Sequence, residues 1–405
     1  MKIVFIHQNM PGQYKHLAAR LAENDGNQVV FITRRKNVEI PRVRKILYET
    51  TRAPNPQIHP YLFRTEDAVL HGQAVVRVLM DLRRDQFIPD IIIGHPGWGE
   101  MFFVKDIFPT VPVLSYCEFY YRARGADMDF DPSAPPEVDS ILRARARSTH
   151  LLHALESCDQ GIAPMQWQRS VHPAIYHDKI NVVHDGIDTN TLRPDENASF
   201  TLPNGEVLTR HDEVVTYVGR NLEPYRGFPS MMRALPHILE ARPNARVLIV
   251  GGDEISYGSG PKDAPNWREK MLAEVPVDTS RVHFLGRIPY GPFINMLRIS
   301  AAHIYLTYPF VLSWSMLESM SLGCVVVGSR SKPVEEVIRD GENGLLVDFF
   351  NPEEIARRVV DVLSDRSSFV PISQNARRTV VRKYDLALCL KKQMEIINSM
   401  TRKGR

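Results

Sequence analysis

Residues suited to phosphate recognition lie close together in the second half of the chain. Gly219 and Arg220 follow an apolar run, and Arg226 and Gly227 stand a few positions later, before a segment with helical apolar spacing. The planar guanidinium group of arginine carries donors spaced to match phosphate oxygens. The first amides of a helix add donors and the positive end of the helix dipole. This stretch therefore predicts a diphosphate site, although two arginines on a solvated loop would give the same pattern.

A second polar stretch lies further along the chain. Ser313, Trp314 and Ser315 lead into a segment expected to be helical, which carries Glu318 in its expected first turn. Amides at a helix start can bind a phosphate or sugar hydroxyls, and a carboxylate can accept hydrogen bonds from two neighbouring hydroxyls. Packing alone could also explain any one of these residues.

The first half of the chain supplies candidates for sugar contact. His95 follows an apolar run, and a second run ends in a polar and aromatic group formed by Tyr116, Glu118 and Tyr121. We expect these side chains at the ends of strands, where they either contact a ligand or shape a loop. His7 ends the first apolar run and is interpreted as a satisfied polar residue.

The elements that position these residues follow a repeated pattern of apolar strand, glycine turn and helix. That alternation is typical of doubly wound parallel sheets. Strands are expected at residues 2–8, 28–33, 90–100, 111–121, 179–188, 213–220, 246–252, 281–287, 302–308 and 324–329. A helix is expected to open at Gly12, another to span 138–157, and the segment 188–211 is interpreted as an interdomain loop. The carboxyl ends of two such sheets would meet at a shared cleft.

Composition narrows the class of protein. The chain has 405 residues, and its 50 basic and 47 acidic residues give a formal net charge of +3. This small bias gives no support for nucleic acid as a partner. A basic run at Arg143, Arg145 and Arg147 is interpreted as a solvated helix face, which leaves peripheral contact with anionic lipid open.

Cysteine usage and hydropathy complete this picture. The four cysteines lie far apart, so neither a zinc site nor a disulfide framework is expected. The first residues do not match a secretory signal, and no apolar run is long enough for a transmembrane helix. The expected location is the cytoplasm, or the inner face of the membrane. Asp127 and Asp129 form the one DxD pattern considered as a metal ligand, and they are interpreted as loop residues.

The motifs taken together resemble the family-4 retaining glycosyltransferases of the GT-B fold. The resemblance runs over residues 1–400 and is carried by five quoted segments. These are HQNMPGQYKHLAARLAE, VVHDGIDTNTLRPD, GRNLEPYRG, LESMSLGCVV and DGENGLLV. It implies two tandem Rossmann-like domains facing a central cleft: an acceptor domain at 1–200 and a donor domain at 201–385. A terminal helix at 386–405 would pack back on the first domain.

The resemblance also implies site roles. Arg220 and Arg226 would hold the donor diphosphate, Glu318 the ribose hydroxyls, and Gly12 would allow the first loop to approach the donor. The remaining implied donor contacts are Gly219, Arg287, Ile288, Ser313, Trp314 and Ser315, and the acceptor contacts are His95, Tyr116 and Tyr121. The substrate would be a UDP- or GDP-linked sugar and the acceptor a glycan, lipid-linked or small-molecule hydroxyl. No metal and no further cofactor are expected.

Two departures from the family pattern concern the sugar. The family usually carries a glutamate eight positions before the ribose-binding one, and here Phe310 occupies that place. Relatives often carry a histidine near the anomeric carbon where this chain has Glu118, which becomes a candidate catalytic residue. Two other interpretations stay open: a sugar-nucleotide epimerase or hydrolase of the same fold, and a non-catalytic nucleotide-sugar binding protein.

Overall fold

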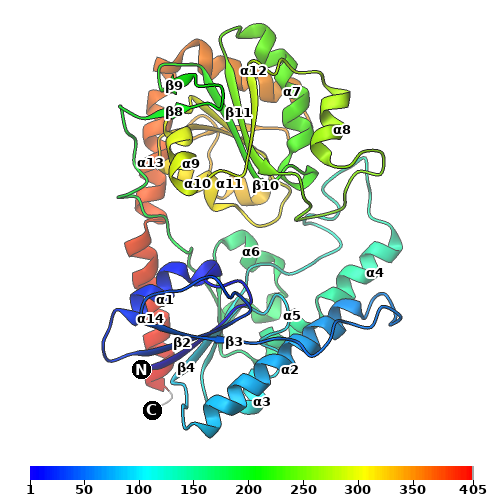
Figure 1. The fold of residues 1–405 in the computed structure, drawn as a ribbon, viewed down its shortest axis with the longest axis vertical. Helices are drawn as coiled ribbons and strands as arrows, with labels where there is room; N and C mark the ends of the chain where they lie inside the picture. The colour runs from blue at the N-terminus through cyan, green and yellow to red at the C-terminus, as the bar shows by residue number, and fades with distance from the viewer. Residues whose placement is uncertain (404–405) are drawn as a thin grey trace. The chain divides into compact units, whose positions relative to one another are not determined.

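The computed structural model describes residues 1–403, and its internal contacts divide them into two compact units. Unit 1 comprises Met1–Gly186 together with the residues from Leu386 onward, and unit 2 comprises Ile187–Asp385. Each unit is built from a parallel sheet with helices on its faces (Figure 1). The α/β fold with two Rossmann-like domains is thus as predicted.

The division falls earlier in the chain than the predicted boundary near residue 200. Ile187 forms a parallel bridge with Asp385 and donates its N–H to the Tyr384 carbonyl at 2.8 Å. The Thr189 hydroxyl donates to the Asp385 carboxylate at 2.6 Å. These bonds attach the segment after Gly186 to unit 2.

The sheet of unit 1 has, within the described residues, seven parallel strands in the order β3-β2-β1-β4-β5-β6-β7. Their bounds are β1 Lys2–Ile6, β2 Gln28–Thr33, β3 Val43–Leu47, β4 Ile91–Gly94, β5 Val113–Tyr116, β6 Gln160–Ala163 and β7 Ile180–Val182. The helical elements of the unit are η1 Gly12–Tyr14, α1 Lys15–Ala22, α2 Phe63–Arg84, α3 Val104–Ile107, α4 Val138–Arg147, α5 Thr149–Ser157, α6 Gln166–Val171, η2 Ala174–Lys179 and α14 Leu386–Lys403.

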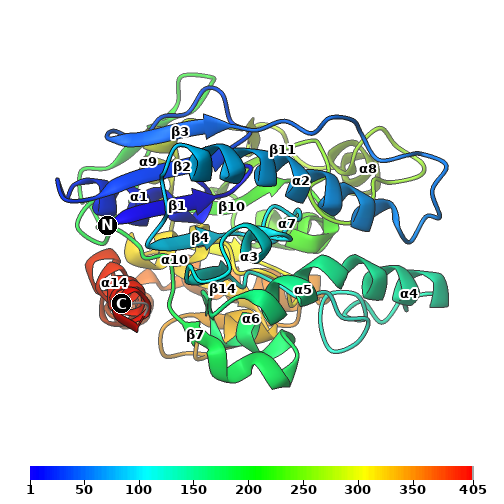
Figure 2. The same ribbon diagram turned by 90° about the horizontal axis from the view of Figure 1, so that it is seen from below.

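Apolar side chains cover both faces of this sheet. Ile3 and Phe5 of β1 belong to a core cluster that includes residues of α1 and α14, whereas Val4 and Ile6 belong to a second cluster with residues of α2 and α5. Successive residues of a strand point to opposite faces, so an unbroken apolar run is what a doubly covered parallel strand requires. Figure 2 shows these strands side by side with α2 and α14 on different sides.

The sheet of unit 2 has, over the same described part, six parallel strands in the order β12-β11-β10-β13-β14-β15. Their bounds are β10 Val214–Asn221, β11 Arg246–Gly252, β12 Val282–Gly286, β13 Ala302–Tyr305, β14 Val325–Ser329 and β15 Leu345–Val347. The helical elements are η3 Pro224–Arg226, α7 Phe228–Ala241, α8 Trp267–Glu274, α9 Tyr290–Arg298, α10 Trp314–Ser321, α11 Lys332–Glu335, α12 Pro352–Ser364, η4 Arg366–Phe369 and α13 Val370–Lys383.

Two local expectations are wrong. The expected loop at 188–211 contains an antiparallel hairpin of β8, Ser199–Thr201, and β9, Val207–Thr209. The expected helix at 138–157 is two helices, because the Ser148 hydroxyl donates to the Ala144 and Tyr121 carbonyls and ends α4. A hydroxyl that bonds the preceding turn commonly bends or ends a helix.

Both sheets reverse their strand order beside their first strand. In unit 1 the reversal lies between β1 and β4, and in unit 2 it lies between β10 and β13. In such sheets a ligand crevice forms at the carboxyl ends of the strands at the reversal point. Each unit therefore has one predicted crevice of its own, and a shared cleft stays a prediction.

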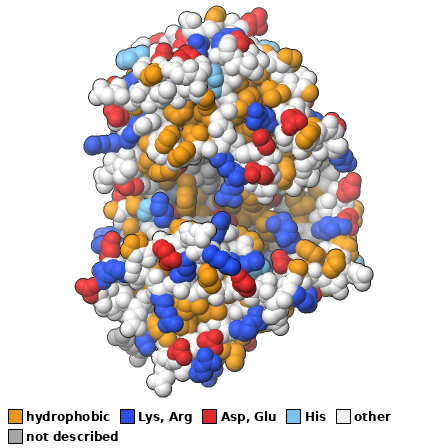
Figure 3. All heavy atoms as spheres, viewed as in Figure 1, with side chains coloured by type: hydrophobic (Ala, Val, Ile, Leu, Met, Phe, Trp, Pro, Cys, Tyr) orange, Lys and Arg blue, Asp and Glu red, His pale blue; other side chains and the backbone are white. Residues whose placement is uncertain are grey.

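The face drawn in Figure 3 carries charged side chains of both signs. Figure 3 shows one face, on which lysine and arginine side chains alternate with aspartate and glutamate. Among the described helices, none combines the length and apolar character needed to cross a bilayer. All four cysteines are buried free thiols.

Candidate functional site

In unit 1, four polar side chains meet at the carboxyl end of the sheet, where the strand order reverses. His7 follows β1, His95 follows β4, Glu118 lies two residues beyond β5, and Gln13 belongs to η1. Parallel strands that end at one edge bring these distant segments together. We call these four residues the Glu118 cluster.

The Glu118 carboxylate accepts hydrogen bonds from two sides. Its Oε1 accepts from Gln13 Nε2 at 2.6 Å, and its Oε2 accepts from His95 Nε2 at 3.3 Å. Its side chain is 30% exposed and so can be reached by a ligand. Burial raises the pKa of Glu118, but the hydrogen bond from His95, the favourable electrostatics of His95 and His7 and the hydrogen bond from Gln13 outweigh it, and the net pKa lies below the usual value. Arg122, a few residues further along the chain, donates to the His172 carbonyl at 2.9 Å.

The imidazole of His7 is neutral with its proton on Nε2. Its Nδ1 accepts from the Asn9 main-chain N–H at 2.9 Å, and its Nε2 lies 2.8 Å from Gln13 Oε1. Since a main-chain N–H can only donate, Nδ1 is unprotonated and Nε2 donates to Gln13. Burial, and then the proximity of His95, lowers the pKa of His7 to about 3.

His95 has the same tautomer. Its Nδ1 accepts from the Gly97 N–H at 3.0 Å, which leaves Nε2 as the donor to Glu118. The ring stacks on Tyr116 with centroids 5.5 Å apart and lies against Trp98 at 5.0 Å. The imidazole is thus held by two ring contacts and at both nitrogens.

Gly12 makes room for this arrangement. It has a left-handed φ of 51°, and a Cβ atom there would lie 2.5 Å from His7 Nε2. Glycine at this position therefore permits the close approach of the loop to His7. Contact with a donor stays a prediction.

The predicted acceptor residues do not form one group. Tyr116 is buried and its hydroxyl donates to Asp185 at 2.8 Å, whereas Tyr121 accepts from Arg147, whose guanidinium lies 3.9 Å from the ring centroid. Only His95 of the three contacts Glu118 by a hydrogen bond. That Tyr116, Glu118 and Tyr121 together line a sugar site stays a prediction.

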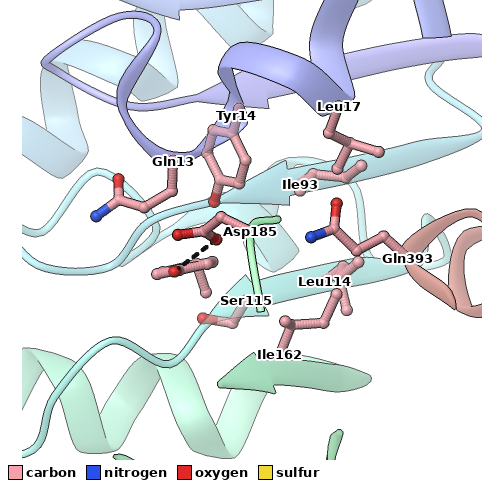
Figure 4. A pocket seen from close by; sticks show the side chains of 10 residues that line it. Gln13, Tyr14, Leu17, Ile93, Leu114, Ser115, Ile162, Asp185 and Gln393 are labelled. Carbon is pink, nitrogen blue, oxygen red and sulfur yellow. Dashed lines mark hydrogen bonds between the residues drawn. The ribbon is translucent and has the colours of Figure 1, made fainter. Parts of the chain in front are cut away.

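A small cavity lies beneath Gln13. Figure 4 shows its lining, which comes from η1, α1, β4, β5, β6, the segment after β7 and α14. Its polar side carries Asp185 and the buried hydroxyls of Tyr14 and Ser115, and neither of these two hydroxyls has a hydrogen-bond partner in the part of the chain that the structure describes. Its other side carries Leu17, Ile93, Leu114 and Ile162 together with the amide of Gln393.

In unit 2, the two predicted phosphate-binding arginines have different environments. Gly219 and Arg220 lie at the end of β10, and Arg220 is exposed. Arg226 is buried, and its Nη1 donates to the Thr307 hydroxyl at 2.9 Å and to the Val311 carbonyl at 3.0 Å. Arg226 thus joins the loops after β10 and β13, on either side of the strand reversal.

The start of α7 differs from the expected anion site. The Phe228 N–H donates to the Glu223 carbonyl at 3.4 Å, and Pro229 has no N–H. Gly227 has a φ of 70°, and a Cβ atom there would lie 2.3 Å from Leu306. Few main-chain N–H groups at this helix start are therefore available to bind an anion. Arg220 is the exposed side-chain donor of this loop.

Glu318 lies in the second turn of α10, not in the first as the sequence predicted. The helix begins at Trp314, after the N-cap Ser313, and Glu318 Oε1 accepts from the Tyr290 hydroxyl at 2.7 Å. The Ser313 side chain accepts a hydrogen bond from the Ser315 N–H, and the Ser313 carbonyl accepts one from the Met316 N–H. The expected amide donors at this helix start therefore have internal partners.

The segment after β12 carries two more predicted donor contacts. Arg287 follows the left-handed Gly286 and donates to Asn221 at 2.9 Å and to Glu254. Ile288 is half-buried beside it. Arg287 thus lies at the same sheet edge as Arg220.

Phe310 is part of an aromatic wall rather than a polar contact. It is buried, edge-on to Tyr257 at 4.9 Å and to Tyr225 at 5.9 Å. Nearby, Tyr225 stacks on Tyr308 at 4.8 Å. The position that the sequence analysis compares with a family glutamate is thus occupied by a ring packed against other rings.

The DxD pattern has a structural role in the loop. Asp129 accepts main-chain bonds from Gly125 and Ala126, and Asp127 is buried. Within residues 1–403, no group of three or more His, Cys, Asp or Glu side chains is placed to hold a metal ion.

The roles of Gln13 and Glu223 were not predicted from the sequence. Glu223 is fully buried and its Oε2 accepts from the Ser256 and Tyr257 N–H groups, which fixes the loop after β11. Glu223 could have been suspected because it is a polar residue just after a predicted strand. Gln13 had none, since its role depends on partners elsewhere in the chain.

Two family models together match most of the chain. "Glycosyl transferase family 4 group" matches residues 25–192, and "Glycosyl transferases group 1" matches residues 202–379. Among curated proteins, a D-inositol 3-phosphate glycosyltransferase of Corynebacterium efficiens is 29% identical over 49% of this chain and 46% of its own length. A glycosyltransferase of Methanocaldococcus jannaschii is 32% identical over 51% and 50%. The chain spans about half the length of these curated relatives.

Solved structures match over nearly the whole chain. Anabaena HepE in complex with UDP-glucose has a TM-score of 0.69 at 16% identity, covering 98% of this chain and all of that one. Sucrose-phosphate synthase from Thermosynechococcus elongatus has a TM-score of 0.73 at 15% identity, with full coverage of both chains. At such identities these likenesses establish the shared fold.

Proposed function

The chain belongs to the group 1 glycosyltransferases of the GT-B fold, and on this premise we propose that it transfers a hexose, with retention, from a UDP- or GDP-linked sugar to a hydroxyl group. The acceptor is a glycan or a lipid-linked sugar, as in the synthesis of polysaccharides and glycoconjugates. HepE and its bound UDP-glucose support the donor class.

The observation that carries the proposal is the position of Arg220. It is exposed at the end of β10, beside the strand reversal of unit 2, within the segment matched by the group 1 model. A leaving nucleoside diphosphate gains negative charge as the glycosidic bond breaks. A preorganised guanidinium stabilises that charge more in the transition state than in the ground state.

The other residues then have distinct tasks. Arg226 binds the loop after β13 through Thr307 and Val311, and so positions the wall of the crevice. Glu318 binds the ribose hydroxyls. Glu118 is an ionised carboxylate that accepts from a donor hydroxyl and stabilises positive charge developing on the sugar ring.

A ligand screen tests the proposal. UDP, GDP and their glucose, mannose and N-acetylglucosamine conjugates are added separately, and thermal unfolding is followed. A ligand at 100 times its Kd stabilises the folded state by about 2.7 kcal/mol, so one nucleotide series is expected to raise the Tm. Release of that nucleoside diphosphate should then depend on an added hydroxyl acceptor.

The alternatives give different results in the same assay. A hydrolase releases the diphosphate without an acceptor, an epimerase converts the sugar without release, and a binding protein shows the Tm shift alone. Any of these three results contradicts the proposed transfer.

Metal removal is a separate test of the mechanism. We expect turnover to persist in EDTA, because Arg220 supplies the charge that a metal would otherwise supply. A strict need for added Mg²⁺ or Mn²⁺ would contradict this mechanism. Turnover with and without EDTA, on enzyme stripped of metals, is the measurement.

A further inference from the structure

Two chains of hydrogen bonds converge on Glu118, and each begins at a main-chain N–H. The first runs from the Asn9 N–H to His7, from His7 to Gln13, and from Gln13 to Glu118. The second runs from the Gly97 N–H through His95 to Glu118. Because a main-chain N–H cannot accept, the direction of every bond in both chains is fixed.

This arrangement sets the orientation of the Gln13 amide. His7 Nε2 donates, so the oxygen of Gln13 faces His7 and its NH₂ group faces Glu118. Both oxygens of Glu118 therefore face donors. Hydrogen bonds from these donors are stronger to a carboxylate than to a neutral carboxyl group, so the ionised form of Glu118 is favoured.

We propose that Gln13 is a positioning residue for Glu118, which holds that carboxylate ionised and in one orientation by relaying the fixed hydrogen bond of His7. This inference rests on the proposed function for the role of Glu118, but the coupling itself is a property of the unliganded protein. Gly12 is needed for the same chain of hydrogen bonds, because any side chain there would displace the His7 nitrogen that bonds Gln13.

The other titratable groups around Glu118 do not compete for its proton. His7 and His95 face it from the segments after β1 and β4 as neutral rings. The phenols of Tyr14 and Tyr116 lie nearby, and burial raises the pKa of each well above its ordinary value, so both stay protonated. Gln13 is thus the uncharged group whose replacement changes the protonation of Glu118 most directly.

Two substitutions of Gln13 separate positioning from packing. Gln13→Met keeps the length and removes both bonds, so the pKa of Glu118 should rise, and kcat should fall about tenfold with little change in the donor KM. Gln13→Glu places a second carboxyl group against Glu118. Such pairs share one proton, so activity should be low near neutral pH and recover as the pH rises. Gln8→Glu adds the same charge to the same loop outside the cluster and serves as the matched control.

The deciding measurement is an NMR titration of carboxyl-labelled glutamate in the full-length protein. The Glu118 signal is assigned by its loss in Glu118→Gln, and thermal unfolding confirms that each variant is folded. An upward pKa shift of Glu118 in Gln13→Met and Gln13→Glu, with none in Gln8→Glu, supports the proposal. An unchanged Glu118 pKa in Gln13→Met overturns it, whether or not the enzyme is active.

The pH profile of kcat distinguishes the effect of Gln13 on Glu118 from the catalytic role of Glu118. If the Glu118 pKa shifts and the acid limb of kcat shifts with it, both the relay and the role of Glu118 are supported. If the pKa shifts while kcat and its profile do not, the relay holds and the proposed catalytic role of Glu118 is wrong.

Discussion

The two arginines of the loop after β10 differ in burial, and this difference separates their expected mutant phenotypes. Arg220→Ala should leave the Tm unchanged and lower kcat by about two to three orders of magnitude, as removal of a preorganised donor does. Arg226→Ala leaves the Thr307 hydroxyl and the Val311 carbonyl without their partner. We expect a loss of about 2–4 kcal/mol of folding free energy together with lower activity.

Thermal unfolding and steady-state kinetics on both variants check this pair. Near-normal turnover in folded Arg220→Ala would show that the exposed arginine does not hold the diphosphate. An unchanged Tm in Arg226→Ala would show that its buried bonds are not structural.

Glu318 is expected to act on the nucleotide rather than on the sugar. Glu318→Gln replaces a charge-assisted acceptor by a neutral one, whose bonds are about half as strong. Free UDP or GDP should lose affinity by the same factor as the sugar donor, about five- to tenfold. Tyr290→Phe, which removes the phenol that bonds Glu318, is the control and should have a smaller effect.

Calorimetric titration of nucleotide and sugar donor measures both affinities. A loss confined to the sugar donor would reassign Glu318 to the sugar.

Residue types predicted part of the site. His95 and Glu118 stand directly after apolar runs, and the topology of a parallel sheet brings such positions together. Gln13 is uncharged and carries no motif, and it lies 105 positions from Glu118 along the chain. Its role arises only from its two partners, so local sequence contains no signal for it. Burial of Arg226 was equally hidden, because Thr307 and Val311 are distant in sequence.

Among the elements, the turn between η3 and α7 is the most constrained. Gly227→Ala forces a side chain into a left-handed conformation, at about 1–2 kcal/mol, and places its Cβ against Leu306. We expect it to lower the Tm by several degrees and to reduce donor affinity through the displaced loop. Gly291→Ala is the matched control: nothing lies within 4 Å of its Cβ position in the first turn of α9.

Urea unfolding of both variants gives the comparison. The control should be neutral or slightly stabilising, since alanine favours a helix over glycine. Equal stabilities of the two variants would contradict the proposed constraint at Gly227.

The elements themselves were largely predictable, and their ends were not. Apolar runs such as residues 28–33 match β2, because a strand buried on both faces needs a continuous apolar segment. The hairpin β8–β9 was taken for a loop because each strand has only three residues. The first turn of α10 was misplaced because only the Ser313 cap geometry fixes its start.

At the scale of the molecule, buried histidines make folding stability dependent on pH. Burial lowers the pKa of His303 and His7 to about 3 and that of His184 to about 4, whereas unfolded histidine titrates near 6.5. Below pH 6.5 the unfolded chain therefore binds protons that the folded chain does not. The folding stability that depends on these histidines being neutral is fully present above pH 6.5 and is lost as the pH falls toward 3–4.

His303→Asn isolates one of these groups. His303 is fully buried, and its Nδ1 contacts the Thr216 hydroxyl at 2.8 Å, a contact that an amide can replace. The slope of unfolding free energy against pH between 4 and 6 should decrease by about one proton, or about 1.4 kcal/mol per pH unit. Urea unfolding across this range measures the slope, and an unchanged slope would contradict the assignment.

The placement of α14 in unit 1 affects how the chain folds during its synthesis. Cys389, Ile397 and Met400 of that helix complete the core cluster that contains Phe5 and Phe31. The ribosome makes β1 before α14, with the whole of unit 2 between them. At 5–20 residues per second, about 200 intervening residues take roughly 10–40 s. Unit 2 thus emerges as one contiguous segment, whereas the core cluster on this face of the first sheet stays incomplete until α14 emerges.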